Sequence, residues 1–149
     1  GHAIELRINA EDPKTKMPSP GTITSYHQPN GMGIRVESAM YQGYTIPPYY
    51  DSLIAKLIAF GNTRQDCINK LLIALDEFFI EGIKTNIDIF KKILSDKDFV
   101  STDIYTKFLE DDKIFLSEFL SSSKGTLMSL INFSVSFVFS RKSFRVTPT

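Results

Sequence analysis

The hydrophobic period of the chain changes between residues 53 and 79, which read LIAKLIAFGNTRQDCINKLLIALDEFF. Residues 53–60 form a short apolar run before Gly61, a pattern typical of a buried strand. Thr63 and Asp66 then resemble a helix capping box, with Asp in place of the usual Glu or Gln. The stretch therefore predicts a strand followed by an amphipathic helix over residues 64–80 that ends near Gly82. The apolar residues that recur at helical spacing are Ile68, Leu71, Leu72, Leu75, Phe78 and Phe79.

The residues upstream of this junction predict further strands. Apolar and polar side chains alternate over residues 2–9, which places Ile4, Leu6 and Ile8 on one strand face. Residues 22–27 and 34–38 predict a hairpin, because Asn30-Gly31 and Gly33 supply turn residues between them.

A second helix is predicted downstream, over residues 87–94, with Asn86 as its cap. Residues 97–110 indicate a short connection that ends in a strand or helix turn at Leu109. Strands followed by helices predict an α+β fold, in which an antiparallel β-sheet precedes the helices.

Composition excludes several classes of function. The 149 residues carry 17 basic and 17 acidic side chains, so the net charge is zero and a strongly basic nucleic-acid binder is excluded. Cys67 is the single cysteine, which excludes an internal disulfide and a multi-cysteine zinc site. Two histidines argue against a histidine-based metal site. We expect Cys67 to be a buried structural thiol rather than a nucleophile.

The last part of the chain differs in composition, with a boundary near residues 113–117. Residues 117–149 carry Lys124, Arg141, Lys142 and Arg145 against Glu118, and apolar residues alternate with mostly Ser and Asn over 131–139. The period of two indicates a strand, and the apolar stretch is too short to span a bilayer. We interpret this tail as read-through or frameshifted sequence without a selected function; the alternative is a docking strand.

Three charged residues are candidates for chemistry. Arg7 lies on the polar face of the first strand, where it would either pair with Glu5 in solvent or present a planar fork of donors to an anion. Asp51 follows Pro47-Pro48-Tyr49-Tyr50, so it is either a turn residue or a firmly held carboxylate that orients an arginine. Lys56 interrupts an apolar strand and indicates an edge position or a snorkelling side chain.

Five ordered blocks of sequence stand out over about residues 1–112. The first block is GHAIELRINAEDP at 1–13, and GYTIPPYYDS at 43–52 is the most specific. The other three are PSPG at 18–21, EGIKTN at 81–86 and TKFLE at 106–110. In this order, the blocks resemble the C-terminal domain of biotin carboxylase. The resemblance implies the C-terminal lobe of an ATP-grasp carboxylase in residues 1–112, whereas the Ser/Phe-rich tail over residues 113–149 matches nothing in that family.

The resemblance also implies a reaction. ATP activates bicarbonate, and the carboxyl group passes to N1′ of biotin on a biotin carboxyl carrier protein, with Mg²⁺ bound alongside ATP. Arg7 matches the arginine that stabilises the enolate-like biotin oxygen, and Asp51 matches a supporting acid near biotin. Ile104 aligns with an apolar residue of the adenine pocket. Met32 and Arg35 match positions in a homodimer interface.

The resemblance further implies an acetyl-CoA carboxylase component that works with carboxyltransferase subunits in fatty acid synthesis in the cytoplasm. Pyruvate, propionyl-CoA and methylcrotonyl-CoA carboxylases share this lobe, so the acyl substrate stays open. The ATP loop, metal-binding glutamates and general base of the family lie upstream of Gly1. We therefore expect a fragment that is inactive alone. The alternatives are a non-catalytic dimerisation or interaction module and the product of a decayed gene.

Overall fold

The computed structural model describes residues 1–48 and 51–101, and the strands and helices below belong to that part of the chain. The strands are β1 (His2–Asn9), β2 (Gly21–Thr22), β3 (Ser25–His27), β4 (Ile34–Glu37), β5 (Thr45–Ile46), β6 (Leu53–Gly61) and β7 (Phe79–Glu81). The helices are α1 (Arg64–Glu77), α2 (Ile87–Ser95) and α3 (Lys97–Ser101). Antiparallel strands followed by helices confirm the predicted α+β class.

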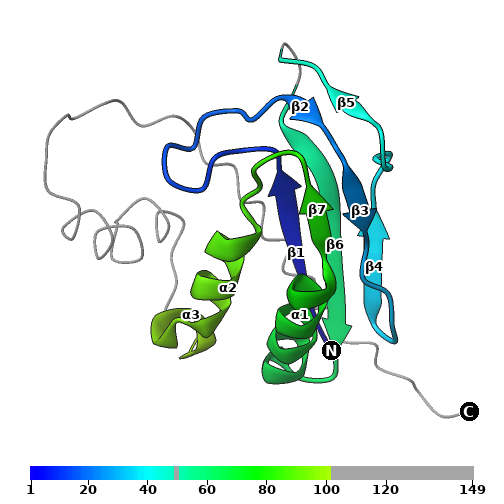
Figure 1. The fold of residues 1–149 in the computed structure, drawn as a ribbon. Helices are drawn as coiled ribbons and strands as arrows, with labels where there is room; N and C mark the ends of the chain where they lie inside the picture. Colours follow the sequence, from blue (N-terminus) through cyan, green and yellow to red (C-terminus); the bar gives the residue numbers. More distant parts are fainter. Residues whose placement is uncertain (49–50, 102–149) are drawn as a thin grey trace, which may run out of the picture.

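The main sheet has three antiparallel strands, with β6 between β1 and β4 (Figure 1). Two smaller sheets pair β2 with β5 and β3 with β7. The register of the main sheet sets Leu6 opposite Leu57, and Leu57 opposite Val36. One face of this sheet is thereby apolar, and α1 packs against it. Its most deeply buried sheet residues are Ile4, Leu6, Ile8, Ala55, Leu57 and Ala59.

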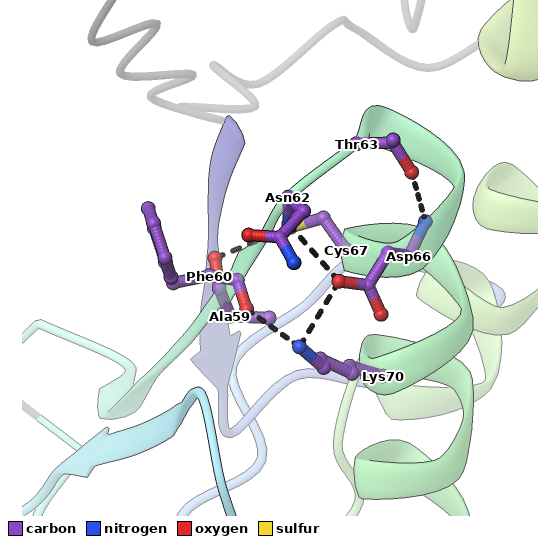
Figure 2. A network of polar contacts seen from close by, with 7 residues as sticks. All are labelled: Ala59, Phe60, Asn62, Thr63, Asp66, Cys67 and Lys70. Carbon is purple, nitrogen blue, oxygen red and sulfur yellow. Dashed lines mark hydrogen bonds and ion pairs between the residues drawn. The ribbon is translucent and has the colours of Figure 1, made fainter. Parts of the chain in front are cut away.

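The junction between β6 and α1 follows the capping pattern read from the sequence (Figure 2). Thr63 is the N-cap, and its Oγ1 accepts a hydrogen bond from the Asp66 backbone N–H at 3.1 Å. The Asp66 carboxylate accepts from the Asn62 backbone N–H at 3.0 Å and pairs with Lys70 at 3.1 Å. These contacts lower the pKa of Asp66, and the Asn62 bond contributes most. Lys70 Nζ also donates to the Phe60 carbonyl at 3.1 Å, which ties α1 to the strand it follows.

Cys67 is fully buried beneath this junction, as predicted for a structural thiol. Its Sγ donates to the Ala59 carbonyl at 3.2 Å. Burial in apolar surroundings raises the pKa of the thiol, which opposes formation of the reactive thiolate.

The hairpin expected between residues 22–27 and 34–38 is wrong. β3 pairs with β7, whereas β4 pairs with β6. Residues 22–27 are split because Ile23 is fully buried and its N–H bonds to the Tyr44 carbonyl, while the next N–H bonds to Glu81. The long β6 offers an edge to β4, and this pairing sets Val36 opposite the fully buried Leu57.

The predicted helix over residues 64–80 ends earlier, at Glu77. Phe78 adopts an extended backbone at the C-cap and is itself buried, and the residues after it form β7. Strand pairing with β3 therefore overrides the helical spacing of Phe78 and Phe79. The connection expected from residue 97 instead begins with α3, because the Asp96 carboxylate accepts from the backbone N–H groups of Asp98 and Phe99.

Two single-residue expectations also change. Lys56 lies on the central strand of the main sheet, so its expected edge position is wrong. Asn86 occupies the N-cap of α2, but its side chain makes no capping bond there. It bonds β1 instead, where its amide satisfies the Arg7 carbonyl and the Asn9 N–H.

Candidate active site

Arg7 and Asp51 meet on the sheet face opposite α1. Arg7 comes from the middle of β1, and Asp51 precedes β6 by two residues. Arg7 Nη2 lies 3.7 Å from Asp51 Oδ2. A quarter of the Arg7 side chain is exposed, against 72% for Asp51. The structure therefore pairs Arg7 with Asp51, from the loop before β6, in place of the solvent-exposed pair with Glu5.

The backbone around Arg7 is held by Asn86, which is 1% exposed. Asn86 Nδ2 donates to the Arg7 carbonyl at 3.1 Å, and Asn86 Oδ1 accepts from the Asn9 N–H at 2.9 Å. These two bonds bracket Ile8, whose side chain is fully buried in the core. Arg7 thus projects from a strand that is fixed both by the sheet and by the start of α2.

Asp51 lies in a turn and beside an arginine. Its Oδ1 accepts from the Leu53 backbone N–H at 3.2 Å, which is a turn contact at the start of β6. Its Oδ2 faces the guanidinium of Arg7. The expectation that Tyr49 and Tyr50 stiffen this loop concerns residues outside the part that the structure describes.

The register places a row of charged residues across this face. Lys56 lies opposite Arg7 on one side and opposite Glu37 on the other. Glu37 pairs with Arg35 at 2.8 Å, and both side chains are largely exposed. Arg7 thus lies in a polar row whose neighbouring strand contributes a second cation.

The guanidinium suits an anionic oxygen. It stays protonated at any working pH and has five N–H donors in one plane. Among residues 1–48 and 51–101, its ion-pair partner is Asp51 alone, at a distance longer than a hydrogen bond. A partly buried cation with donors to spare can stabilise negative charge that develops on a substrate oxygen.

Residues 5–111 match the family model described as the biotin carboxylase C-terminal domain. The chain belongs to this family. It is 57% identical over 111 residues to "Biotin carboxylase 1" of Bacillus subtilis. The aligned region is 74% of this chain and 25% of that protein. It is 47% identical to a pyruvate carboxylase polypeptide of Methanothermobacter thermautotrophicus, covering 74% of this chain and 23% of that one.

A solved structure of a biotin carboxylase–β,γ-ATP complex from Campylobacter jejuni superposes with a TM-score of 0.73. It is 46% identical and covers 75% of this chain and 25% of that chain. The chain thus spans about a quarter of the length of the relatives it matches. These findings confirm the family resemblance and the lobe read from the sequence.

The remaining sites implied by the biotin carboxylase resemblance fall in different places. Met32 is 94% exposed in the turn before β4, and Arg35 is exposed on β4. Ile104 and the tail over residues 113–149 lie outside the described residues. Within residues 1–48 and 51–101, no three His, Cys, Asp or Glu side chains gather as a metal site would require. Over the same residues, no helix has the length and apolar character needed to cross a membrane.

Two residues of the site, Glu11 and Asn86, received no functional role from the sequence. Glu11 joins the Asp51 loop to β1 through hydrogen bonds to Ser52 and Asn9. Both residues belong to blocks that carry the family resemblance, RINAEDP and EGIKTN. The role of a buried asparagine such as Asn86 can be recognised only when the backbone groups that it bonds are known, and the sequence does not reveal them.

Proposed function

We propose that this chain forms the C-terminal portion of a biotin carboxylase, which uses ATP and bicarbonate to carboxylate biotin on a carrier protein. The observation that carries the proposal is the ion pair of Arg7 with Asp51, on the sheet face opposite α1. Membership of the biotin carboxylase C-terminal domain family supports it.

Arg7 would stabilise the negative charge on the biotin carbonyl oxygen as the ring nitrogen attacks. An ion pair this exposed contributes at most about 1 kcal/mol to stability, so stability alone does not explain it. Asp51 would orient the guanidinium without touching the reacting atoms. We therefore assign Arg7 as the catalytic group and Asp51 as its positioning carboxylate.

The cofactors of the proposed reaction divide between two parts of the protein. The carbonyl of carrier-bound biotin fits the Arg7 donor fork. Among the described residues no cluster of carboxylates could hold Mg²⁺. We therefore assign Mg²⁺ and the phosphates of ATP to the part of the relatives that this chain does not cover. We propose that Ile104 contacts the adenine, and that residues 1–112 are the domain, with 113–149 as an appended tail.

The proposed partners follow the same resemblance. Met32 and Arg35 are exposed next to each other around the start of β4, which supports a homodimer contact there. A biotin carboxyl carrier protein and carboxyltransferase subunits would complete the enzyme, in the cytoplasm. Acetyl-CoA carboxylase in fatty acid synthesis is the proposed setting. The similarity to a pyruvate carboxylase polypeptide makes pyruvate the second candidate acceptor.

A second candidate function is a non-catalytic dimerisation module. The observation that favours it is the exposure of Met32 and Arg35, the two positions that the resemblance assigns to a dimer interface. Such a module would dimerise while contributing nothing to carboxylation.

The test replaces the matching segment of the Bacillus subtilis biotin carboxylase 1 with residues 1–112 of this chain. We expect the hybrid to carboxylate free biotin with ATP and bicarbonate. Arg7→Ala should lower kcat by about 10² to 10³-fold, the usual cost of one oxyanion donor. Arg7→Lys should recover little, because lysine lacks the planar fork.

The matched control is Lys91→Ala, which removes an ion pair to Asp76 between α2 and α1, away from the proposed site. It should leave the hybrid's kcat close to that of the unsubstituted hybrid. A folded hybrid with no carboxylation, or one whose kcat is insensitive to Arg7, would overturn the catalytic proposal and leave the dimerisation module.

A further inference from the structure

The Arg7–Asp51 pair needs support from other residues. Asp51 is 72% exposed and its carboxylate lies 3.7 Å from the guanidinium, a distance at which attraction in solvent is weak. The two residues also belong to separate backbone segments, β1 and the loop before β6. Their spacing must therefore be set by contacts between those two segments.

The sheet ladder is irregular at the relevant end. The register of β1 with β6 shifts between Ile8 and Asn9, and pairing resumes with Asn9 opposite Leu53, so the ladder holds the two segments less regularly beside the Asp51 loop. Asn86 fixes the β1 side of this irregularity, through Arg7 and Asn9, but it does not reach the loop.

Glu11 spans the two segments at this point. Its Oε1 accepts from Asn9 Nδ2 at 3.0 Å and from Ser52 Oγ at 2.5 Å. Asn9 is two residues beyond Arg7 on β1, and Ser52 directly follows Asp51. The Ala10 N–H bonds to the Ser52 carbonyl at 2.7 Å and adds a backbone link beside it. Hydrogen bonds to an ionised carboxylate are shorter and stronger than neutral ones, so this bridge resists separation of the segments.

We propose that Glu11 is a positioning residue, which holds the Asp51 loop against β1 through Ser52 and Asn9 and thereby sets the spacing of Arg7 and Asp51. The inference rests on the function proposed above, because that function makes Arg7 and Asp51 a site. Glu11 does not touch the substrate in this scheme and acts only through its two hydrogen-bond donors.

The test uses the 149-residue chain labelled with ¹⁵N and follows the side-chain Nε–Hε resonance of Arg7, assigned by its loss in Arg7→Lys. The variant Asp51→Asn removes the ion pair, so its spectrum gives the reference chemical shift of an unpaired Arg7. We expect Glu11→Ala to move the Arg7 resonance most of the way to that position. Ser52→Ala, which cuts the loop side of the bridge, should move it in the same direction. Glu11→Gln keeps an acceptor oxygen at the same place and should restore the native position.

The control is Asp12→Ala, in the same loop as Glu11. Asp12 accepts from the Lys14 and Thr15 N–H groups and pairs with Lys84, but it does not contact Asn9 or Ser52. It should leave the Arg7 resonance in place. Urea titrations of each variant confirm that it is folded when its spectrum is recorded.

Three results would overturn the positioning role. The first is an Arg7 resonance unchanged in folded Glu11→Ala and Ser52→Ala. The second is an equal shift in Asp12→Ala, which would indicate general loosening of the loop. The third is an Arg7 resonance insensitive to Asp51→Asn. None of these readouts uses carboxylation. An inactive hybrid combined with the expected spectra would therefore reject the proposed function and leave the positioning by Glu11 intact.

Discussion

Asn86 links β1 to the start of α2 through a single buried side chain. Its amide satisfies the Asn9 N–H and the Arg7 carbonyl, and its backbone N–H reaches the Asn9 carbonyl at 3.3 Å. Buried polar groups are stable only when they are hydrogen-bonded. The residue therefore stabilises the fold at the same place where it fixes the backbone of Arg7.

Replacing Asn86 by Ala should lower the free energy of unfolding by about 2 to 4 kcal/mol, because two partly buried backbone groups lose their hydrogen-bond partners. Urea unfolding measures the change. Asn69 is an exposed asparagine on α1 that bonds Gln65 at 2.9 Å, and Asn69→Ala should cost less than about 0.5 kcal/mol. Equal losses in the two variants would contradict the role assigned to Asn86.

The loop between β1 and β2 is organised by one carboxylate. Asp12 accepts from the N–H groups of Lys14 and Thr15 at 2.8 and 3.0 Å and pairs with Lys84, which follows β7. The hydrogen bond from Lys84, with the two backbone bonds, holds the pKa of Asp12 far below its usual value of 3.8. Glu11 precedes Asp12 in this loop but is held by its own partners, Asn9 and Ser52.

Stability should depend on pH through Asp12. A folded-state pKa below the unfolded value means that the unfolded chain binds the proton first as the pH falls. The stabilisation by Asp12 is therefore complete above its unfolded pKa of 3.8 and is lost progressively at lower pH. Urea titrations measure the free energy of unfolding of the native chain and of Asp12→Asn. The difference between the two values should become smaller below about pH 4. A difference that stays constant between neutral and acidic pH would refute this linkage.

The elements show why some predictions from the sequence were confirmed and others were wrong. β1, β6 and the start of α1 were predicted because alternation, apolar runs and capping residues are local signals. The hairpin from residues 22–27 failed because the choice of partner strand is not local: β3 pairs with residues more than fifty positions away. The last turn of the expected helix was lost to the same pairing, through Phe79.

At the scale of the molecule, one face of the main sheet is apolar and packed by α1, and the other carries the proposed site, with the charged side chains of Arg7, Lys56 and Glu37 in one row. The buried hydrophobic residues of the described part lie between Ile4 and Phe99 and form one cluster. Arg64 joins α1 to α3 at one end of this cluster. Its guanidinium lies 4.7 Å from the Phe99 ring centroid and donates to the Phe99 carbonyl at 2.7 Å.

Deleting residues 117–149 should leave the unfolding midpoint of the chain unchanged, because the described residues already form one hydrophobic cluster and the family match ends at residue 111. Solubility should stay the same or improve, since the removed sequence alternates Phe with Ser in a pattern typical of aggregation-prone strands. Thermal and urea unfolding of chains 1–116 and 1–149 make the comparison. A large loss of stability on deletion would instead favour a docking strand.

The sequence by itself determined the α+β class, the strand that carries Arg7, the capped start of α1 and the family, because these depend on short periodic patterns and ordered motifs. Only the tertiary structure decided which strands pair, that Arg7 meets Asp51, and that Asn86 serves β1 rather than its own helix. Those contacts join residues as much as 79 positions apart. Their formation depends on which sheet edges and buried polar groups remain unpaired after collapse, and no local pattern encodes that information.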